Sequence, residues 1–147
     1  MAYHVHRQIR GAVVTLLTGL ATTGTRVYAN RLRPMQDSDL PGLRVFLDDE
    51  SAEAATADSP TTIKRTITLV VEACAKYSAG LDDSLDQMSK EVEVALKDGA
   101  TIAGRYVPIS YIGMAFTDEQ SDRPIGVKRM SFNVEAYTKS DAPDTLV

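Results

Sequence analysis

The segment from residue 61 to residue 98 constrains the fold most, because it reads as a long strand followed by an amphipathic helix. Along the strand every second side chain is apolar, and this row comprises Ile67, Leu69, Val71, Ala73 and Ala75. After a break at residues 78–80, apolar residues return at helical spacing, and this stripe comprises Leu81, Leu85, Met88, Val92 and Leu96. Periods of 2.0 and 3.6 residues indicate a strand and a helix that each bury one face. The sequence therefore predicts a sheet with this helix packed on it.

The length and charge of the chain favour a single globular domain that does not bind nucleic acid specifically. Its 147 residues are 44% hydrophobic and 24% charged, which is ordinary for one domain. The net charge of -4 opposes broad binding to phosphate backbones, which needs a basic surface. We therefore predict one domain over residues 1–147.

The remaining periodic segments complete an α+β fold. Residues 4–22 read as a second amphipathic helix, with Gly24 as its C-terminal cap. Four further strands are predicted over residues 26–31, 43–48, 105–117 and 126–138. Pro108 and Gly113 indicate an edge position or a bulge for the third of these strands. The predicted fold is a small mixed, mostly antiparallel sheet of four to five strands, with two amphipathic helices on one face, in the order α-β-β-β-α-β-β.

Three segments lack this periodicity. Residues 48–60 contain five acids, no base and mostly small side chains, so we expect a mobile loop there. Residues 139–147 are polar, and we expect a frayed C-terminal tail. Residues 118–124 are expected to form a polar turn.

No motif in the sequence indicates catalysis, a cofactor or a metal. His4 and His6 have no further His or Cys to complete a metal site, and Cys74 lies among apolar neighbours, as a buried structural thiol does. Glycine-rich nucleotide-binding motifs are absent. Neither a signal peptide nor an apolar run of the ~20 residues that cross a bilayer is expected, so we predict synthesis in a reducing cytoplasm and no membrane partner.

The order of the elements resembles a known family of assembly proteins. The segments that carry the likeness are Val27-Tyr28, residues 41–47, the strand at 65–73, the helix start at 81–86, its end at 92–96, and Met130-Ser131-Phe132-Asn133-Val134-Glu135-Ala136-Tyr137. Together they resemble the tail terminator proteins of long-tailed bacteriophages, a family that includes the minor tail protein U of lambda-like phages.

This resemblance implies a structural role without catalysis. Such proteins form a ring, usually of six copies, on the head-proximal end of the tail tube, where they stop tube growth and present a surface to the head connector or stopper protein. The implied partners are therefore further copies of the chain, the major tail tube protein and the connector, within the virion tail. Genome DNA would pass through the ring.

Charged and aromatic residues near the margins of the sheet are the candidates for an assembly interface. They are Arg44, Phe46, Asp48, Asp49, Glu50, Glu53, Asp58, Arg65, Asp118, Glu119, Asp122, Arg123 and Lys128. Arg44, Arg65 and Lys128 are expected to pair with acids of a neighbouring subunit, at about 0–1 kcal/mol each. The acidic loop is expected to order on contact with the tube. Two alternatives stay open: another neck component, such as a head–tail connector or completion protein, or a small ligand-binding domain or enzyme.

Overall fold

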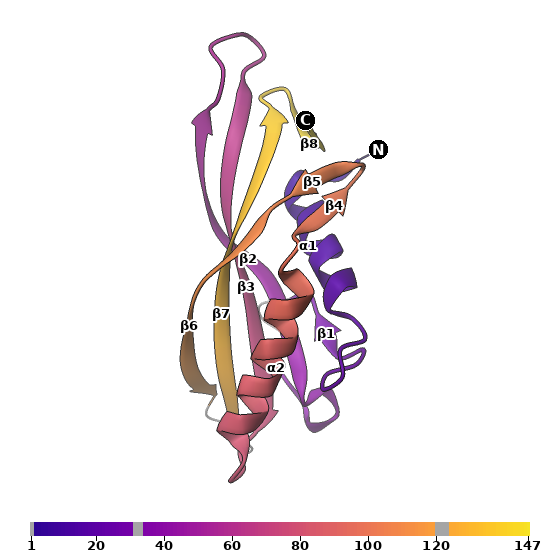
Figure 1. The fold of residues 1–147 in the computed structure, drawn as a ribbon, viewed down its shortest axis with the longest axis vertical. Helices are drawn as coiled ribbons and strands as arrows, with labels where there is room; N and C mark the ends of the chain where they lie inside the picture. Colours follow the sequence, from indigo (N-terminus) through magenta and orange to yellow (C-terminus); the bar gives the residue numbers. More distant parts are fainter. Residues whose placement is uncertain (1, 31–33, 120–123) are drawn as a thin grey trace.

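The computed structural model describes residues 2–30, 34–119 and 124–147 (Figure 1). The elements follow in the order α1 (Val5–Leu17), β1 (Val27–Tyr28), a 3-10 turn (Asp37–Asp39), β2 (Gly42–Ala54), β3 (Thr62–Lys76), α2 (Leu81–Leu96), β4 (Ala100–Ile102), β5 (Arg105–Val107), β6 (Ile109–Glu119), β7 (Ile125–Lys139) and β8 (Ala142–Leu146).

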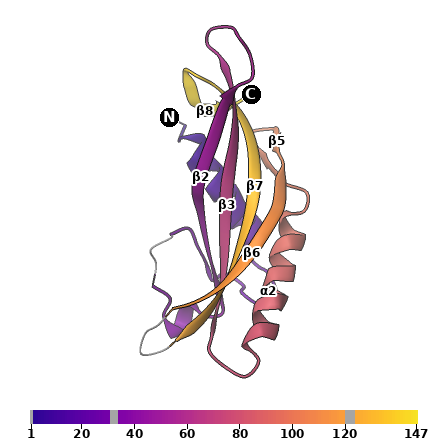
Figure 2. The same ribbon diagram turned by 90° about the vertical axis from the view of Figure 1, so that its left-hand side faces the viewer.

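The main sheet has six strands in the spatial order β1-β2-β3-β7-β6, with β8 paired to the end of β7. Only the β1–β2 pair is parallel. Strands β4 and β5 form a separate two-stranded hairpin. The predicted α+β class and the mostly antiparallel sheet are confirmed, while the strand count of four to five was too low. Figure 2 shows the four long strands side by side along the length of the molecule.

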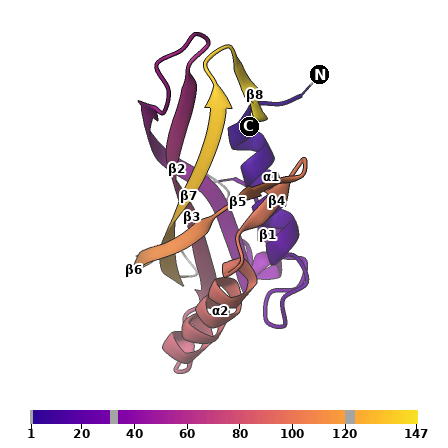
Figure 3. The same ribbon diagram turned by 45° about the horizontal axis from the view of Figure 1, so that its top comes forward.

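One face of the sheet carries the core, and both helices cover that face (Figures 1 and 3). The predicted alternation along β3 and β7 is confirmed, since Leu69, Val71 and Phe132 lie in the core with α1 and α2. On α2 the four core side chains Leu85, Met88, Val92 and Leu96 are each 1% exposed. Burial of a side chain of this kind contributes roughly 1.5–3 kcal/mol before entropy is counted.

The N-terminal helix is shorter than predicted. α1 ends at Leu17, not at residue 22, and Thr18 already has an extended conformation. Gly19 follows with a φ of 96°, a value that favours glycine, so the helix ends before Gly19, and the predicted cap Gly24 belongs to a later turn, with a φ of 55°. The apolar stripe misled the prediction because Leu20, although partly buried against the core, lies beyond the helix.

The predicted acidic loop is largely strand, and this prediction was wrong for residues 48–54. β2 continues to Ala54 and pairs with β3 throughout, with a register shift between Leu47 and Asp49. The pairing places Glu53 opposite Lys64 on β3, so opposite charges stabilise a segment that lacks apolar side chains. Only residues 55–61 connect the two strands, and the hairpin projects beyond the helices (Figure 1).

The C-terminal tail is not frayed, because residues 142–146 form β8. The strand pairs with the end of β7, and Leu146 reaches the core at 8% exposure. Gln8 of α1 donates a hydrogen bond of 2.7 Å from Nε2 to the carbonyl oxygen of Asp144. Figure 3 shows β8 beside the N-terminal end of α1. Contacts with α1, distant in sequence, therefore order a segment whose polar composition suggested disorder.

The predicted strand at 105–117 is divided. β5 ends at Val107 and β6 begins at Ile109, so Pro108 marks the division. β5 turns away to pair with β4, while β6 pairs with β7. β6 is an edge strand with a register shift between Tyr111 and Gly113, which confirms both features that Pro108 and Gly113 indicated.

Candidate assembly surface

Arg44 lies in the middle of an ion-pair network on the sheet face opposite the helices. It is 5% exposed, and its Nε lies 3.1 Å from Oε1 of Glu72 on β3. Its guanidinium also pairs with Glu119 at the end of β6. Burial alone would lower the pKa of Arg44, but the hydrogen bond to Glu119 and nearby negative charge raise it. The side chain therefore stays charged and joins three strands of its own chain.

Phe46 lies on the same face of β2 as Arg44, and Asp48 lies in the bulge that follows. Phe46 is only 8% exposed, and the guanidinium of Arg129 lies 5.6 Å from the centre of its ring. Arg129 also pairs with the half-exposed Asp48 at 3.4 Å. Phe46 is therefore part of the packing of the outer sheet face.

Arg65 and Glu50 meet at the base of the β2–β3 hairpin, beside the start of α1. Nη1 of Arg65 donates to both carboxylate oxygens of Glu50, at 3.1 and 3.0 Å, and Nε donates to Oγ1 of Thr138 at 3.0 Å. Nε2 of His6 lies 2.8 Å from Oε1 of Glu50. Burial alone would raise the pKa of Glu50, but the hydrogen bonds from His6 and Arg65, with their charges, bring it below its usual range.

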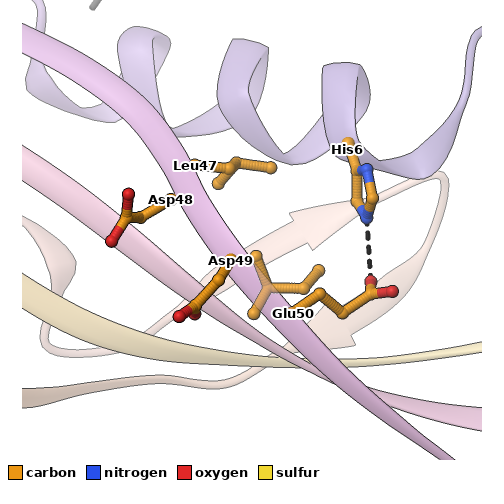
Figure 4. Close-up of a pocket in the computed structure, with 6 residues that line it drawn as sticks. His6, Leu47, Asp48, Asp49 and Glu50 are labelled. Carbon is orange, nitrogen blue, oxygen red and sulfur yellow. Dashed lines mark hydrogen bonds and ion pairs between the residues drawn. The ribbon is translucent and has the colours of Figure 1, made fainter.

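This cluster borders a small hollow of about 170 Å³, lined by His6, Leu47, Asp48, Asp49, Glu50 and Ile67. Figure 4 shows that the carboxylates of Asp48 and Asp49 point away from the His6–Glu50 pair. Acid–base catalysis by two carboxyl groups requires both to converge on one bond. The hollow does not have this arrangement, and its polar groups serve to anchor α1 to the hairpin.

Lys128 also pairs within its own chain. Its Nζ lies 3.0 Å from Oδ1 of Asp86 on α2 and 5.6 Å from the centre of the Phe116 ring. Thus Arg44, Arg65 and Lys128, the predicted cations of an interface, all have acidic partners inside the chain.

The remaining predicted acids lie near the two ends of the sheet. Asp49, Glu53 and Asp58 are exposed along the projecting hairpin, and Asp58 lies 4.0 Å from Lys139. Asp118 is exposed at the end of β6, next to Glu119. Asp122 and Arg123 lie outside the described residues.

An apolar row on β6, which the candidate residues did not include, brings together four exposed large hydrophobic side chains. Its four members are Tyr111, Ile112, Met114 and Phe116, with exposures of 44, 52, 43 and 51%. We call these four residues the β6 edge. Contiguous apolar side chains on an unpaired strand edge are typical of protein contact sites. Pro108 and Gly113 indicated in the sequence that this strand lies at an edge. They did not predict that its apolar side chains would be exposed.

A second exposed apolar feature lies where the end of α1 meets α2. An open hollow of about 270 Å³ is lined by Leu20, Lys90, Glu91, Val94 and Ala95, and Val94 is 55% exposed. We call this feature the helix hollow. Glu91 is held inward, because Oε1 accepts from the backbone N–H of Thr22 at 2.9 Å and Oε2 accepts from the Thr22 hydroxyl.

Clustered metal ligands and long apolar helices are two further features that residues 2–30, 34–119 and 124–147 lack. These residues contain no group of three or more His, Cys, Asp or Glu side chains placed to hold a metal ion. None of the helices described is both long and apolar enough to cross a membrane.

Comparison with known proteins identifies the class to which this fold and these surfaces belong. Residues 4–143 match the family model of phage minor tail protein U. The chain therefore belongs to the phage minor tail protein U family, and it is a structural protein of the virion tail.

Other comparisons add little to this assignment. No curated protein matches the chain. Among solved structures, a chain of the virion of a native gene transfer agent particle is similar, with a TM-score of 0.48, 15% sequence identity, and 92% of each chain covered.

Proposed function

We propose that the chain forms a ring on the head-proximal end of the tail tube, where it stops tube growth and offers a surface for joining the head. The observation that carries this proposal is the family match over residues 4–143, nearly the whole chain. The ring consists of six copies, and its other partners are the major tail tube protein and the head connector or stopper protein.

The unlike surfaces of the chain support a ring. A head-to-tail contact uses two different patches on each copy, and it closes into a ring when its rotation closes. The β6 edge is apolar, whereas the projecting hairpin is acidic. One subunit can therefore use different surfaces toward its own copies and toward the proteins above and below the ring.

The acidic hairpin is the candidate surface for the axial partner. Glu53 and Asp58 lie on the part of the chain that extends farthest beyond the helices (Figure 1). Exposed carboxylates of this kind steer association with a basic partner more than they strengthen it. The hairpin therefore favours a partner whose facing surface carries lysine or arginine.

Tail length in particles assembled with and without the chain tests the proposed function. Without the protein, tubes are expected to grow past their normal length and to remain unjoined to heads, and adding the wild-type protein should restore both features. The double variant E53K/D58K is expected to fold normally and to bind tube ends more weakly, while E53D/D58E, which keeps both charges, is the matched control. Tubes of normal length that join heads without the protein would contradict the proposal.

A further inference from the structure

Three side chains of the β6 edge lie on the helix side of the sheet, and of these Phe116 borders a hollow that the start of α2 also lines. Tyr111 is the register partner of Phe132, Met114 of Met130 and Phe116 of Lys128, and the partners on β7 belong to the helix-covered face. α2 packs on β3 and β7. The β6 edge is therefore a continuation of the core face that is only partly covered in the isolated chain.

The helix hollow has the complementary character. Its floor is apolar, formed by Leu20, Val94 and Ala95, and the exposed Lys90 stands on its rim. Glu91 also lines the hollow as a carboxylate, and its oxygens are bonded to Thr22 and Gln87, so Lys90 is the charged side chain of the lining that is exposed to a docking partner. The exposed acid Asp118 follows the apolar row of the β6 edge, and its charge is opposite to that of Lys90, whereas Glu119 pairs with Arg44 of its own chain.

The two surfaces also lie apart on the molecule. β6 forms one lateral edge of the sheet, whereas α1 and the turn that follows it lie toward the opposite side (Figure 1). One copy can thus offer its β6 edge to a neighbour while its helix hollow receives the β6 edge of another. An apolar patch that fits a pocket elsewhere on the same molecule makes a head-to-tail contact, and such contacts generate rings or filaments.

We propose that the β6 edge of one copy docks in the helix hollow of a second copy, and that this contact links the subunits of the ring. The proposal rests on the proposed function and names the surface through which copies associate. Met114 and Phe116 cover the apolar floor at Val94, and Asp118 approaches Lys90. The hairpin base with its Glu50–Arg65 pair takes no part in this contact.

Complementation between two variants tests the proposal. Met114→Asp destroys the β6 edge and Val94→Asp destroys the helix hollow, and both sites are exposed, so each variant should keep the wild-type unfolding midpoint. Each variant alone should associate roughly tenfold or more weakly than the wild type, because a charge is placed in the centre of the contact. A mixture of the two should form dimers and stop there, since only one intact pair of surfaces remains.

The control for this experiment is Tyr106→Asp, which changes a 64% exposed side chain on β5 outside both surfaces. It should associate like the wild type. If the Val94→Asp variant assembles as the wild type does, the proposal is overturned. A contact between two β6 edges would give that result, because it does not involve Val94. So does a mixture that contains only monomers while the wild type assembles.

Cross-linking on tail tubes separates this proposal from the proposed function. The double variant Val94→Cys/Met114→Cys, bound to purified tubes and treated with a short bis-maleimide, should give a ladder of multimers. The native Cys74 is 0% exposed and its pKa is raised to about 12 by burial, so it should not react. Each single-cysteine variant should give no ladder.

The outcomes are distinguished by an amine-reactive cross-linker used on the wild type. If that reagent links copies on the tubes but the double-cysteine variant gives no ladder, the proposed contact between the β6 edge and the helix hollow is wrong, while the proposed ring is retained. If neither reagent links copies on the tubes, both the contact and the ring are wrong.

Discussion

The two long edges of the sheet differ in chemistry, although they belong to one continuous set of strands. Beyond its bulge, β2 presents Asp49, Glu50 and Glu53, and among the described residues no further strand pairs with this part of it. β6 presents Tyr111, Ile112, Met114 and Phe116. Charged side chains on an edge prevent pairing with other chains, whereas apolar side chains invite contact. The two edges therefore differ in how readily they would pair with or contact another chain.

The largest effect is expected at the residue that ties the two edges together. Arg44→Ala leaves Glu72, 8% exposed, without its closest cation and releases Glu119 at the end of β6. We expect the free energy of unfolding to fall by about 3–5 kcal/mol, as measured by urea denaturation. The double variant R44M/E72M should recover most of this loss, because no buried charge remains.

A surface ion pair provides the control for Arg44. Lys64 lies 3.5 Å from Glu135, and both side chains are about one-third exposed or more, at 35 and 40%. Lys64→Ala should lower the free energy of unfolding by about 0–1 kcal/mol. An Arg44→Ala variant no less stable than this control would mean that the two edges are not coupled through Arg44.

Two methionines that are register partners separate the core from the β6 edge. Met130 is 0% exposed and Met114 is 43% exposed, although they lie side by side on β7 and β6. Met130→Ala should cost about 2–5 kcal/mol of stability, and Met114→Ala about 0.5 kcal/mol or less. Denaturation of both variants tests this difference. Equal costs would show that the β6 edge belongs to the core.

Acid should weaken the anchor between the hairpin and α1. The pKa of Glu50 is lower in the folded chain than in the unfolded one, so its contribution to stability is present above the unfolded pKa of about 4.3. This contribution disappears as the pH falls through the folded pKa. Glu50→Gln should therefore lose less stability than the wild type between about pH 5 and pH 3, in urea titrations at each pH. A parallel decline in both proteins would contradict the assigned role of Glu50.

The smallest effect on stability is expected on the acidic edge itself. Asp49→Val and Glu53→Val together make the exposed part of β2 apolar, and the unfolding midpoint should change little because both sites are exposed. Light scattering of the concentrated protein should nevertheless rise, since the charges that oppose edge pairing are gone. The double variant D49N/E53Q is the control for shape. Unchanged scattering of the valine variant would weaken the comparison between the two edges.

The sequence predicted the elements with strong periodicity and missed those that depend on distant partners. The alternation around Leu69 and the stripe of α2 are local patterns, and both were correct. The strand at residues 48–54 and β8 have polar sequences, and they are ordered by pairing with β3 and by contact with α1. Such contacts cannot be read from the segment itself, because the stabilising groups lie elsewhere in the chain.

The candidate site was predicted less well than the fold. The sequence analysis predicted that charged residues form the assembly interface, yet Arg44, Arg65 and Lys128 form ion pairs within the chain. The β6 edge was recognised as an edge from Pro108 and Gly113, but its exposure depends on α2 stopping short of it. The position of α2 is set by its packing on β3 and β7. No local sequence pattern in β6 predicts where that helix ends.

Hydrogen exchange of the backbone amides of β6 tests the central claim most directly. The rates are compared between the free chain and the chain assembled on tail tubes, with α2 and β3 as internal references. We predict that exchange in residues 109–119 slows markedly on assembly, because the β6 edge becomes covered by a second copy. Equally fast exchange of these amides in both states, in protein that is demonstrably bound to tube ends, would contradict the account.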